Sequence, residues 1–190
     1  QDGRHVRIQA GRIRSIEPHD PGARSAAGRV IEAHGRLLIP GLVEMHAHVP
    51  PANSPKLQPV LDLFLANGVT TLRGVLGEPG QLDLREAIAR GERIAPRLYT
   101  SGPSLNGTSV ADAEAAVRMV EAQKRAGYDL LKLHPGLDRA RHDAIVATAR
   151  RLGIPVAGHV SEAVGLEHAL HMGGMGTIEH LDDYVRALVP

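Results

Sequence analysis

The stretch LIPGLVEMHAHV, residues 38–49, decides both the fold and the chemistry predicted for this chain. Pro40 and Gly41 predict a turn that leads into a short apolar strand, and the strand ends in two histidines. Residues two apart in a strand point to the same face, so the side chains of His46 and His48 should lie side by side. In parallel α/β proteins chemistry takes place at the carboxyl ends of strands, which is where this pair falls.

Strand-like runs and helical patterns alternate from residue 42 onward. The strand-like runs begin near Leu42, Val69, Arg97, Tyr128, Ile154 and Gly176. This repetition predicts a parallel sheet with right-handed crossovers, either doubly wound or a (β/α)8 barrel that stops early. A Gly-x-Gly-x-x-Gly fingerprint is absent after the first strand, which argues against a nucleotide-binding α/β domain with incidental histidines. A full barrel typically needs roughly 250 residues, so about six strands fit here.

Residues 1–40 have a different pattern. Residues 6–10 and 12–16 alternate between apolar and polar side chains around Gly11, which is typical of a hairpin. Residues 29–33 and 36–39 are further strand candidates. We therefore expect a separate β segment at 1–40 and a (β/α) domain at 41–190.

The composition excludes several classes of function. The chain has 190 residues, 43% of them hydrophobic, and a net charge of +1, which suits a sizeable core and gives no argument for binding nucleic acid. No apolar run reaches the roughly 20 residues of a membrane helix, so no membrane association is expected. The N-terminal stretch lacks the apolar core of a signal peptide, which makes the cytoplasm the default expectation. Because the chain has no cysteine, a metal would need histidine, carboxylate or modified lysine ligands.

Four predicted strand ends carry residues suited to one metal centre. The first strand carries His46 and His48, and the later strands carry Lys132, His159 and His180. Any one of these residues alone is more often a packing or surface residue. Their joint placement favours a metal site, because imidazole suits zinc and related transition metals.

These residues carry a resemblance to the metal-dependent amidohydrolase superfamily. The segment IPGLVEMHAHV resembles its first barrel strand, usually Pro-Gly-Leu-Ile-Asp-x-His-x-His, with Glu44 in place of the aspartate. The order His-x-His, Lys, His, His also matches, so the resemblance covers nearly the whole chain. The branch that it resembles most is the imidazolonepropionase and Xaa-Pro dipeptidase-like one.

The resemblance implies a truncated barrel with a binuclear metal centre. It implies a distorted (β/α)8 barrel that lacks its seventh and eighth units, and a partial β-sandwich at residues 1–40. The implied ligands are His46, His48, Lys132, His159 and His180, holding one or two divalent ions, zinc by expectation. Carbon dioxide would modify Lys132 to a carbamate that bridges the ions, and Lys132 and His180 would be catalytic. The aspartate that ends the family's eighth strand has no counterpart here.

The predicted activity is hydrolysis of an amide, cyclic amide or dipeptide bond by metal-activated hydroxide. The alternative is an incomplete, inactive metal-binding fragment, because the eighth-strand aspartate is missing. The expected partner is a small-molecule or dipeptide substrate. A sheet that stops after six strands leaves unpaired edges, so we also expect either a longer polypeptide or a homo-oligomer that covers them.

Other polar residues receive weaker predictions. His134 and Tyr184 are candidates for substrate binding, because they follow the strands of Lys132 and His180. Arg73 ends the second strand and suits either a substrate carboxylate or a structural role. We interpret the helical histidines His142, His168 and His171 as surface or packing residues.

Overall fold

The computed structural model of the chain describes residues 3–20 and 28–188. These residues belong to two compact units, Gln1–Pro40 and Gly41–Pro190.

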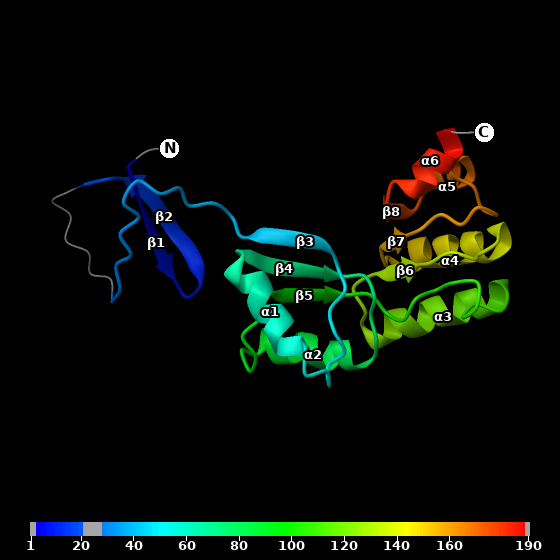
Figure 1. The fold of residues 1–190 in the computed structure, drawn as a ribbon, viewed down its shortest axis with the longest axis horizontal. Coiled ribbons are helices and arrows are strands. Elements are labelled where there is room, and N and C mark those ends of the chain that lie inside the picture. The colour runs from blue at the N-terminus through cyan, green and yellow to red at the C-terminus, as the bar shows by residue number, and fades with distance from the viewer. Residues whose placement is uncertain (1–2, 21–27, 189–190) are drawn as a thin grey trace. The chain divides into compact units, whose positions relative to one another are not determined.

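The N-terminal unit contains an antiparallel hairpin of β1 (Arg4–Gln9) and β2 (Arg12–Pro18). Ala10 and Gly11 make the two-residue turn, both with positive φ (49° and 71°), as the twist of a tight hairpin requires. The predicted hairpin is therefore present (Figure 1).

The two other strands predicted in this unit are wrong. Residues 29–33 and 36–39 contain no strand, and their apolar side chains Val30, Ile31, Leu37 and Leu38 are exposed. Alternation favours a strand only where a partner strand and an apolar surface are available. The described residues of this unit form a two-stranded hairpin and provide no further partner strand or apolar surface. The partial β-sandwich expected at residues 1–40 stays a prediction.

The second unit is a βα repeat with six parallel strands. The strands are β3 (Leu42–Ala47), β4 (Val69–Gly74), β5 (Arg97–Thr100), β6 (Leu131–Leu133), β7 (Val156–Gly158) and β8 (Met175–Ile178). They form two three-stranded sheets in sequence order, β3-β4-β5 and β6-β7-β8. Parallel bridges from Ser101 to Leu130 and from Leu105 to Leu133 join the two sheets. All six predicted strand positions are confirmed; the missing barrel units remain a prediction.

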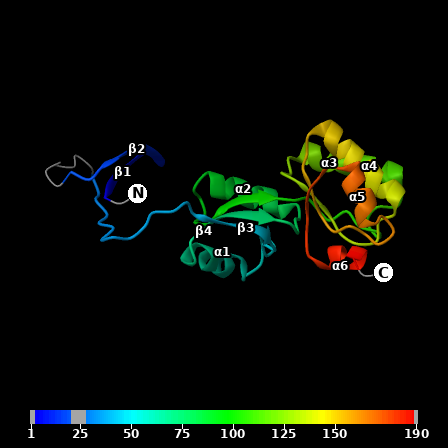
Figure 2. The ribbon, with the colours of Figure 1, turned by 90° about the horizontal axis from the view of Figure 1, so that it is seen from above.

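A helix follows each strand. The helices are α1 (Leu57–Ala66), α2 (Gly80–Ala89), α3 (Ala113–Ala126), α4 (Arg139–Leu152), α5 (Leu166–Met172) and α6 (Asp182–Leu188). Asp112 and Asp138 cap α3 and α4 through their carboxylates, while Gly127 and Gly153 end these helices with positive φ. In Figures 1 and 2, α3 and α4 lie side by side along the second sheet. None of the helices in the described part of the chain is long and apolar enough to cross a membrane.

The main core lies between the strands and their helices. Leu131 and Leu133 of β6 pack there against residues of α3 and α4 such as Val120 and Ile145. Side chains alternate along a strand, so the intervening Lys132 faces the opposite side of the sheet. Its neighbour across the ladder is Ala157 of β7. The strand pattern thus separates an apolar outer face from a polar inner one.

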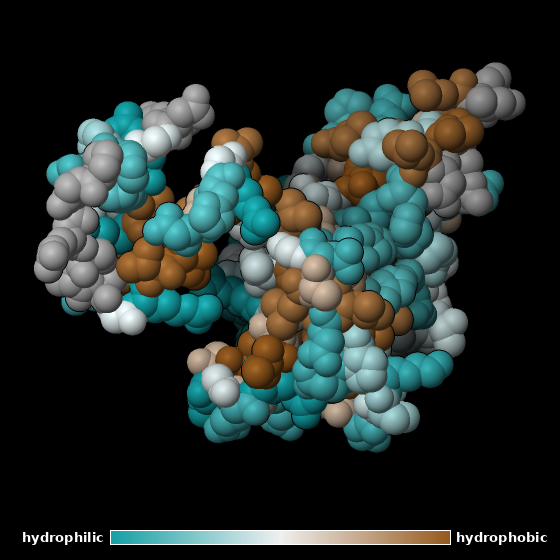
Figure 3. Space-filling model, turned by 60° about the vertical axis from the view of Figure 1, so that its left-hand side comes forward, coloured by the Kyte–Doolittle hydropathy of each residue, from teal (hydrophilic) through white to brown (hydrophobic). Residues whose placement is uncertain are grey.

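Apolar side chains are also exposed in the second unit. On the edge strand β3, about half of the surface of Leu42, Val43 and Met45 is exposed. Brown surface in Figure 3 marks further exposed apolar residues around α6, which include Leu181 and Leu188.

Candidate metal centre

Histidines from three strand ends form one continuous cluster. The ring centroid of His46 lies 5.3 Å from that of His48 and 4.7 Å from that of His180. His180 in turn stacks on His159 at 4.7 Å. The ends of the first, fifth and sixth strands of the second unit therefore meet at one place.

Lys132 lies beside this cluster with its whole side chain buried. Its ammonium nitrogen Nζ has no hydrogen-bond partner among the described residues. Burial lowers the pKa of Lys132; the charge of Glu179 opposes this shift, and that of Arg73 adds to it. A buried cation without a partner is costly, so the neutral amine is favoured more than at an ordinary lysine.

Glu179 holds the His46 ring through its Nδ1 atom. Its Oε2 atom lies 2.7 Å from His46 Nδ1, and its Oε1 atom accepts hydrogen bonds from Arg73 and from Thr177. Burial favours protonation of Glu179, but the hydrogen bonds from Thr177 and His46 and the charge of Arg73 hold its pKa below the ordinary value. An ionised carboxylate at Nδ1 fixes the tautomer of His46 and leaves Nε2 as the metal-binding nitrogen.

A second carboxylate approaches His159. Asp183 of α6 is buried, and its Oδ2 atom lies 3.7 Å from His159 Nδ1 and accepts a hydrogen bond from the backbone N–H of Val160. Two of the clustered histidines thus each have a carboxylate near Nδ1, the arrangement that usually accompanies metal-ligating histidines.

His134 extends the cluster on the other side. Its ring stacks on His159 at 5.4 Å, and its Nδ1 atom lies 2.7 Å from Ser104 Oγ in the loop after β5. Burial lowers the pKa of His134 to about 4, and the nearby Lys132 and His159 act in the same direction. His134 is therefore neutral at pH 7 and can donate or accept a hydrogen bond.

The cluster is open to solvent along one side. His48 and His180 are exposed, whereas His46, His134 and His159 are partly buried. Partial burial lowers the pKa of His48, and the neighbouring His46 and Lys132 lower it further. His180 has a left-handed backbone with φ of 72°, and its ring contacts those of His46 and His159.

The sequence-predicted residues are thus brought together, with one exception. Tyr184 lies in α6, is 36% exposed, and has no ring contact or side-chain hydrogen bond to the cluster among the described residues. Glu44, which replaces the family's aspartate, accepts a hydrogen bond from the backbone N–H of His46 at 2.7 Å. It supports His46 through the backbone rather than through the ring.

Sequence reasoning missed Glu179, Asp183 and Ser104. Glu179 directly precedes His180, and Asp183 follows three residues later, so proximity to a predicted ligand was the available signal. Their partners, however, lie on other strands, and a linear pattern does not identify which carboxylate reaches which ring.

The chain is similar to several known proteins. No protein-family model matches it. Adenine deaminase 2 of Rhizobium meliloti (strain 1021) is 31% identical over 172 residues, and adenine deaminase 3 of Rhizobium johnstonii is 29% identical over 177 residues. These matches span 80% and 84% of this chain but only 27% and 29% of the two deaminases, respectively. The chain therefore spans less than a third of these relatives.

Several solved structures are also similar to this chain. The bottromycin amidohydrolase is 27% identical with a TM-score of 0.72, and the match covers 94% of this chain and 38% of that one. A putative prolidase from Bifidobacterium longum is 26% identical with a TM-score of 0.74, covering 90% and 47%. A Xaa-Pro dipeptidase at 19% identity and a TM-score of 0.66 shares the fold.

Proposed function

The chain belongs to the amidohydrolase superfamily, and we propose that it provides the metal centre of a hydrolase that cleaves a carbon–nitrogen bond. The observation that carries this proposal is the buried Nζ of Lys132, which lies beside a cluster of imidazoles and has no hydrogen-bond partner among the residues that the structure describes. Buried polar atoms normally have a partner, and a buried lysine without one marks a group that is modified or used.

The residues fit a metal centre with a carbamylated lysine. The neutral amine of Lys132 is the form that reacts with carbon dioxide. The carbamate product is an anion and can bind metal, whereas the ammonium of an unmodified lysine would repel it. His46 and His48 would hold one divalent ion, and His159 and His180 a second, with Lys132 shared between them. Imidazole nitrogens are common ligands of zinc, so zinc is the metal that we propose. When bound, such ions polarise a carbonyl oxygen and make hydroxide available near neutral pH.

The other residues of the centre would orient its ligands and the substrate. Glu179 keeps the Nδ1 proton on His46, and Asp183 lies where it can do the same for His159. His134, neutral and fixed by Ser104, would bind a polar atom of the substrate. Arg73 is already paired with Glu179, which favours its structural role over substrate binding.

The favoured substrates are amides, cyclic amides or dipeptides. The similarity to a prolidase and to an amidohydrolase supports this class. A second candidate is deamination of adenine, which the names of the curated relatives favour. Both reactions add water at a carbon bonded to nitrogen, so one metal centre serves either.

A metal measurement combined with an activity assay tests the proposal. We expect chain purified without chelator to contain zinc or another transition metal, and His180→Asn to lower this content. Asparagine tolerates the left-handed backbone at this position, so the fold should persist. His34→Asn is the matched control, because His34 also has a positive φ (48°) but lies in the N-terminal unit. A metal content that is the same in both variants and in wild type would contradict the proposed centre.

Hydrolysis of Xaa-Pro dipeptides, cyclic amides and adenine should be assayed on the same metal-loaded samples. Turnover that is lost in His180→Asn and kept in His34→Asn supports catalysis. Metal binding without turnover would support the alternative, an inactive metal-binding fragment. We also propose that the exposed edge strands β3 and β8 are covered by additional chain or by a second copy, which light scattering would detect.

A further inference from the structure

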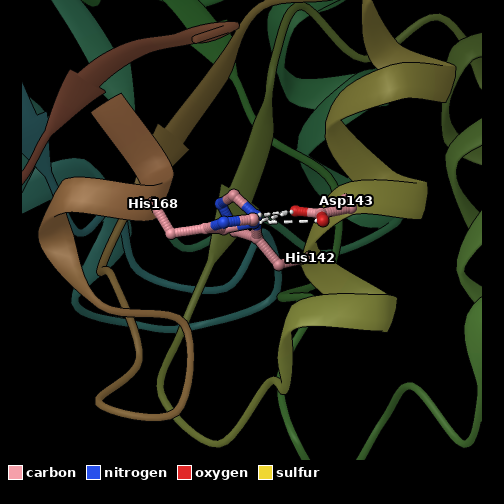
Figure 4. A group of neighbouring side chains, drawn as sticks. All are labelled: His142, Asp143 and His168. Atoms are coloured by element: carbon pink, nitrogen blue, oxygen red, sulfur yellow. Dashed lines mark hydrogen bonds and ion pairs between the residues drawn. The ribbon is translucent and has the colours of Figure 1, made fainter. Parts of the chain in front are cut away.

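A second group of ligand-type side chains lies between α4 and α5, and none of its members belongs to the histidine cluster at the strand ends. It consists of His142 and Asp143 of α4 and His168 of α5 (Figure 4). Each residue offers a ligand atom within 4.8 Å of those of the other two. Among the described residues this is the one group that meets so tight a spacing.

Asp143 is the centre of the group. Its Oδ1 atom lies 3.0 Å from His142 Nδ1 and 2.8 Å from His168 Nε2, and its Oδ2 atom lies 3.0 Å from His168 Nε2. Both imidazoles therefore point a nitrogen at one carboxylate, as the dashed lines in Figure 4 show. Burial raises the pKa of Asp143, but the contacts with His142 and His168 hold it below the ordinary value, so Asp143 is ionised.

His142 is the buried member of this group. It is 1% exposed, and its second ring nitrogen, Nε2, is buried without a hydrogen-bond partner in the described part of the protein. The Nδ1 atom of the His142 ring contacts Asp143, and this contact points the ring toward the other two residues of the group.

The donor set suits a tetrahedral zinc ion. Two imidazoles and one carboxylate form a three-ligand site whose fourth position is taken by water. Bond lengths of about 2.0–2.1 Å place tetrahedral ligand atoms about 3.3 Å apart. The two nitrogen–oxygen distances, 3.0 and 2.8 Å, are a few tenths of an ångström shorter, and the two imidazole nitrogens lie within 4.8 Å of each other. The side chains of Asp143 and His168 are 33% and 25% exposed, so water can reach the fourth position.

We propose that His142, Asp143 and His168 form a second zinc site, open to one water, that links α5 to α4. Zinc would replace protons between Asp143 and the two imidazoles. The short helix α5 has no side-chain cap at its N-terminus, so a metal link to α4 would fix it in place. The site is independent of the proposed catalytic centre.

Zinc counting in a background without the catalytic centre tests this site. Lys132→Met removes the shared ligand at the strand ends, and zinc alone is then added to the metal-free chain. We expect one equivalent of zinc that survives in Lys132→Met and is lost when His168→Gln or Asp143→Asn is added. His171→Gln is the matched control, because His171 is an exposed histidine of the same helix whose ring Nδ1 atom lies 2.9 Å from the carbonyl oxygen of Glu167.

The expected melting temperature of Lys132→Met rises with zinc, and this rise disappears with His168→Gln but not with His171→Gln. Circular dichroism in chelator checks that all variants remain folded. Equal zinc content with and without His168→Gln, in folded protein, would overturn the proposal. That result would not count against the proposed catalytic centre. The ligands of that centre are intact in the wild-type chain, and it is tested separately with His180→Asn.

Discussion

His46 Nδ1 lies 2.7 Å from Glu179 Oε2, although the two residues stand 133 positions apart in the chain. His46 ends the first strand of the second unit, and Glu179 follows the last. The contact therefore shows that the six strands curve enough for the two outer strand ends to meet. Arg73 of β4, one of the four strands between them in sequence, holds the other oxygen of Glu179.

We predict that Glu179→Gln weakens metal binding by about 10–100-fold, the usual effect of losing a carboxylate behind a ligating histidine. An amide in place of the carboxylate no longer fixes the Nδ1 proton on His46, and it leaves Arg73 without its charge partner. Titration of the metal-free chain with zinc measures the affinity. Glu162→Gln is the control, since Glu162 is an exposed glutamate outside the cluster. Equal affinities in the two variants would argue against a positioning role for Glu179.

Lys132→Met should remove both metal ions from the strand ends, because it removes their shared ligand, and it should abolish any effect of bicarbonate on metal loading. Methionine has a similar length and no charge, so the buried position remains filled. Metal analysis with and without added bicarbonate is the measurement. Wild-type loading that is insensitive to bicarbonate, or a Lys132→Met variant that loads as wild type does, would end the carbamate hypothesis.

In the metal-free chain, His134 should titrate with a midpoint near pH 4, which is observable in NMR spectra. Its pKa is lower in the folded chain than the ordinary value of 6.5, so the unfolded state binds the proton more readily. Stability contributed by neutral His134 is therefore present above about pH 6.5 and is lost as the pH falls toward 4. Lys132→Met removes a neighbouring positive charge and should raise the midpoint. A wild-type midpoint near 6.5 would be inconsistent with this environment.

Gly158→Ala should destabilise the second unit by more than Gly153→Ala does. Gly158 has a φ of 142°, and an added Cβ would meet the carbonyl oxygen of Leu133 at 2.2 Å. Gly153 also has a positive φ (62°) but open space around it, so alanine there costs only about 1–2 kcal/mol of backbone strain. Overpacking at Gly158 adds about 1–3 kcal/mol. Thermal unfolding followed by circular dichroism compares the two variants. Equal losses of stability would show that β7 can move away from β6 to accommodate the added Cβ.

The sequence was informative where local periodicity determines structure. Alternation and helical spacing located all six strands of the second unit, and strand parity placed Lys132 opposite Leu131 and Leu133. His46 and His48 share a face for the same reason. These features depend only on the geometry of a strand, so they can be derived without knowledge of the partners.

The remaining features depend on tertiary contacts. The strands predicted at 29–33 and 36–39 do not form, because alternation does not specify a partner strand. The role of Glu179 depends on how far the sheet curves, and the grouping of His142 with His168 depends on how α5 packs against α4. Each pairs residues from different βα units, and no local pattern records the pairing.

The order of the ligands along the chain has a consequence for folding. The histidine cluster draws on the first, the fifth and the sixth strands, and Lys132 comes from the fourth. Contacts between residues so distant in sequence form late, after the local βα units, because closing long loops costs chain entropy before any contact compensates for it. Tight metal capture at the strand ends should accordingly be one of the last events of refolding. Its rate would report completion of the curved sheet rather than formation of any one βα unit.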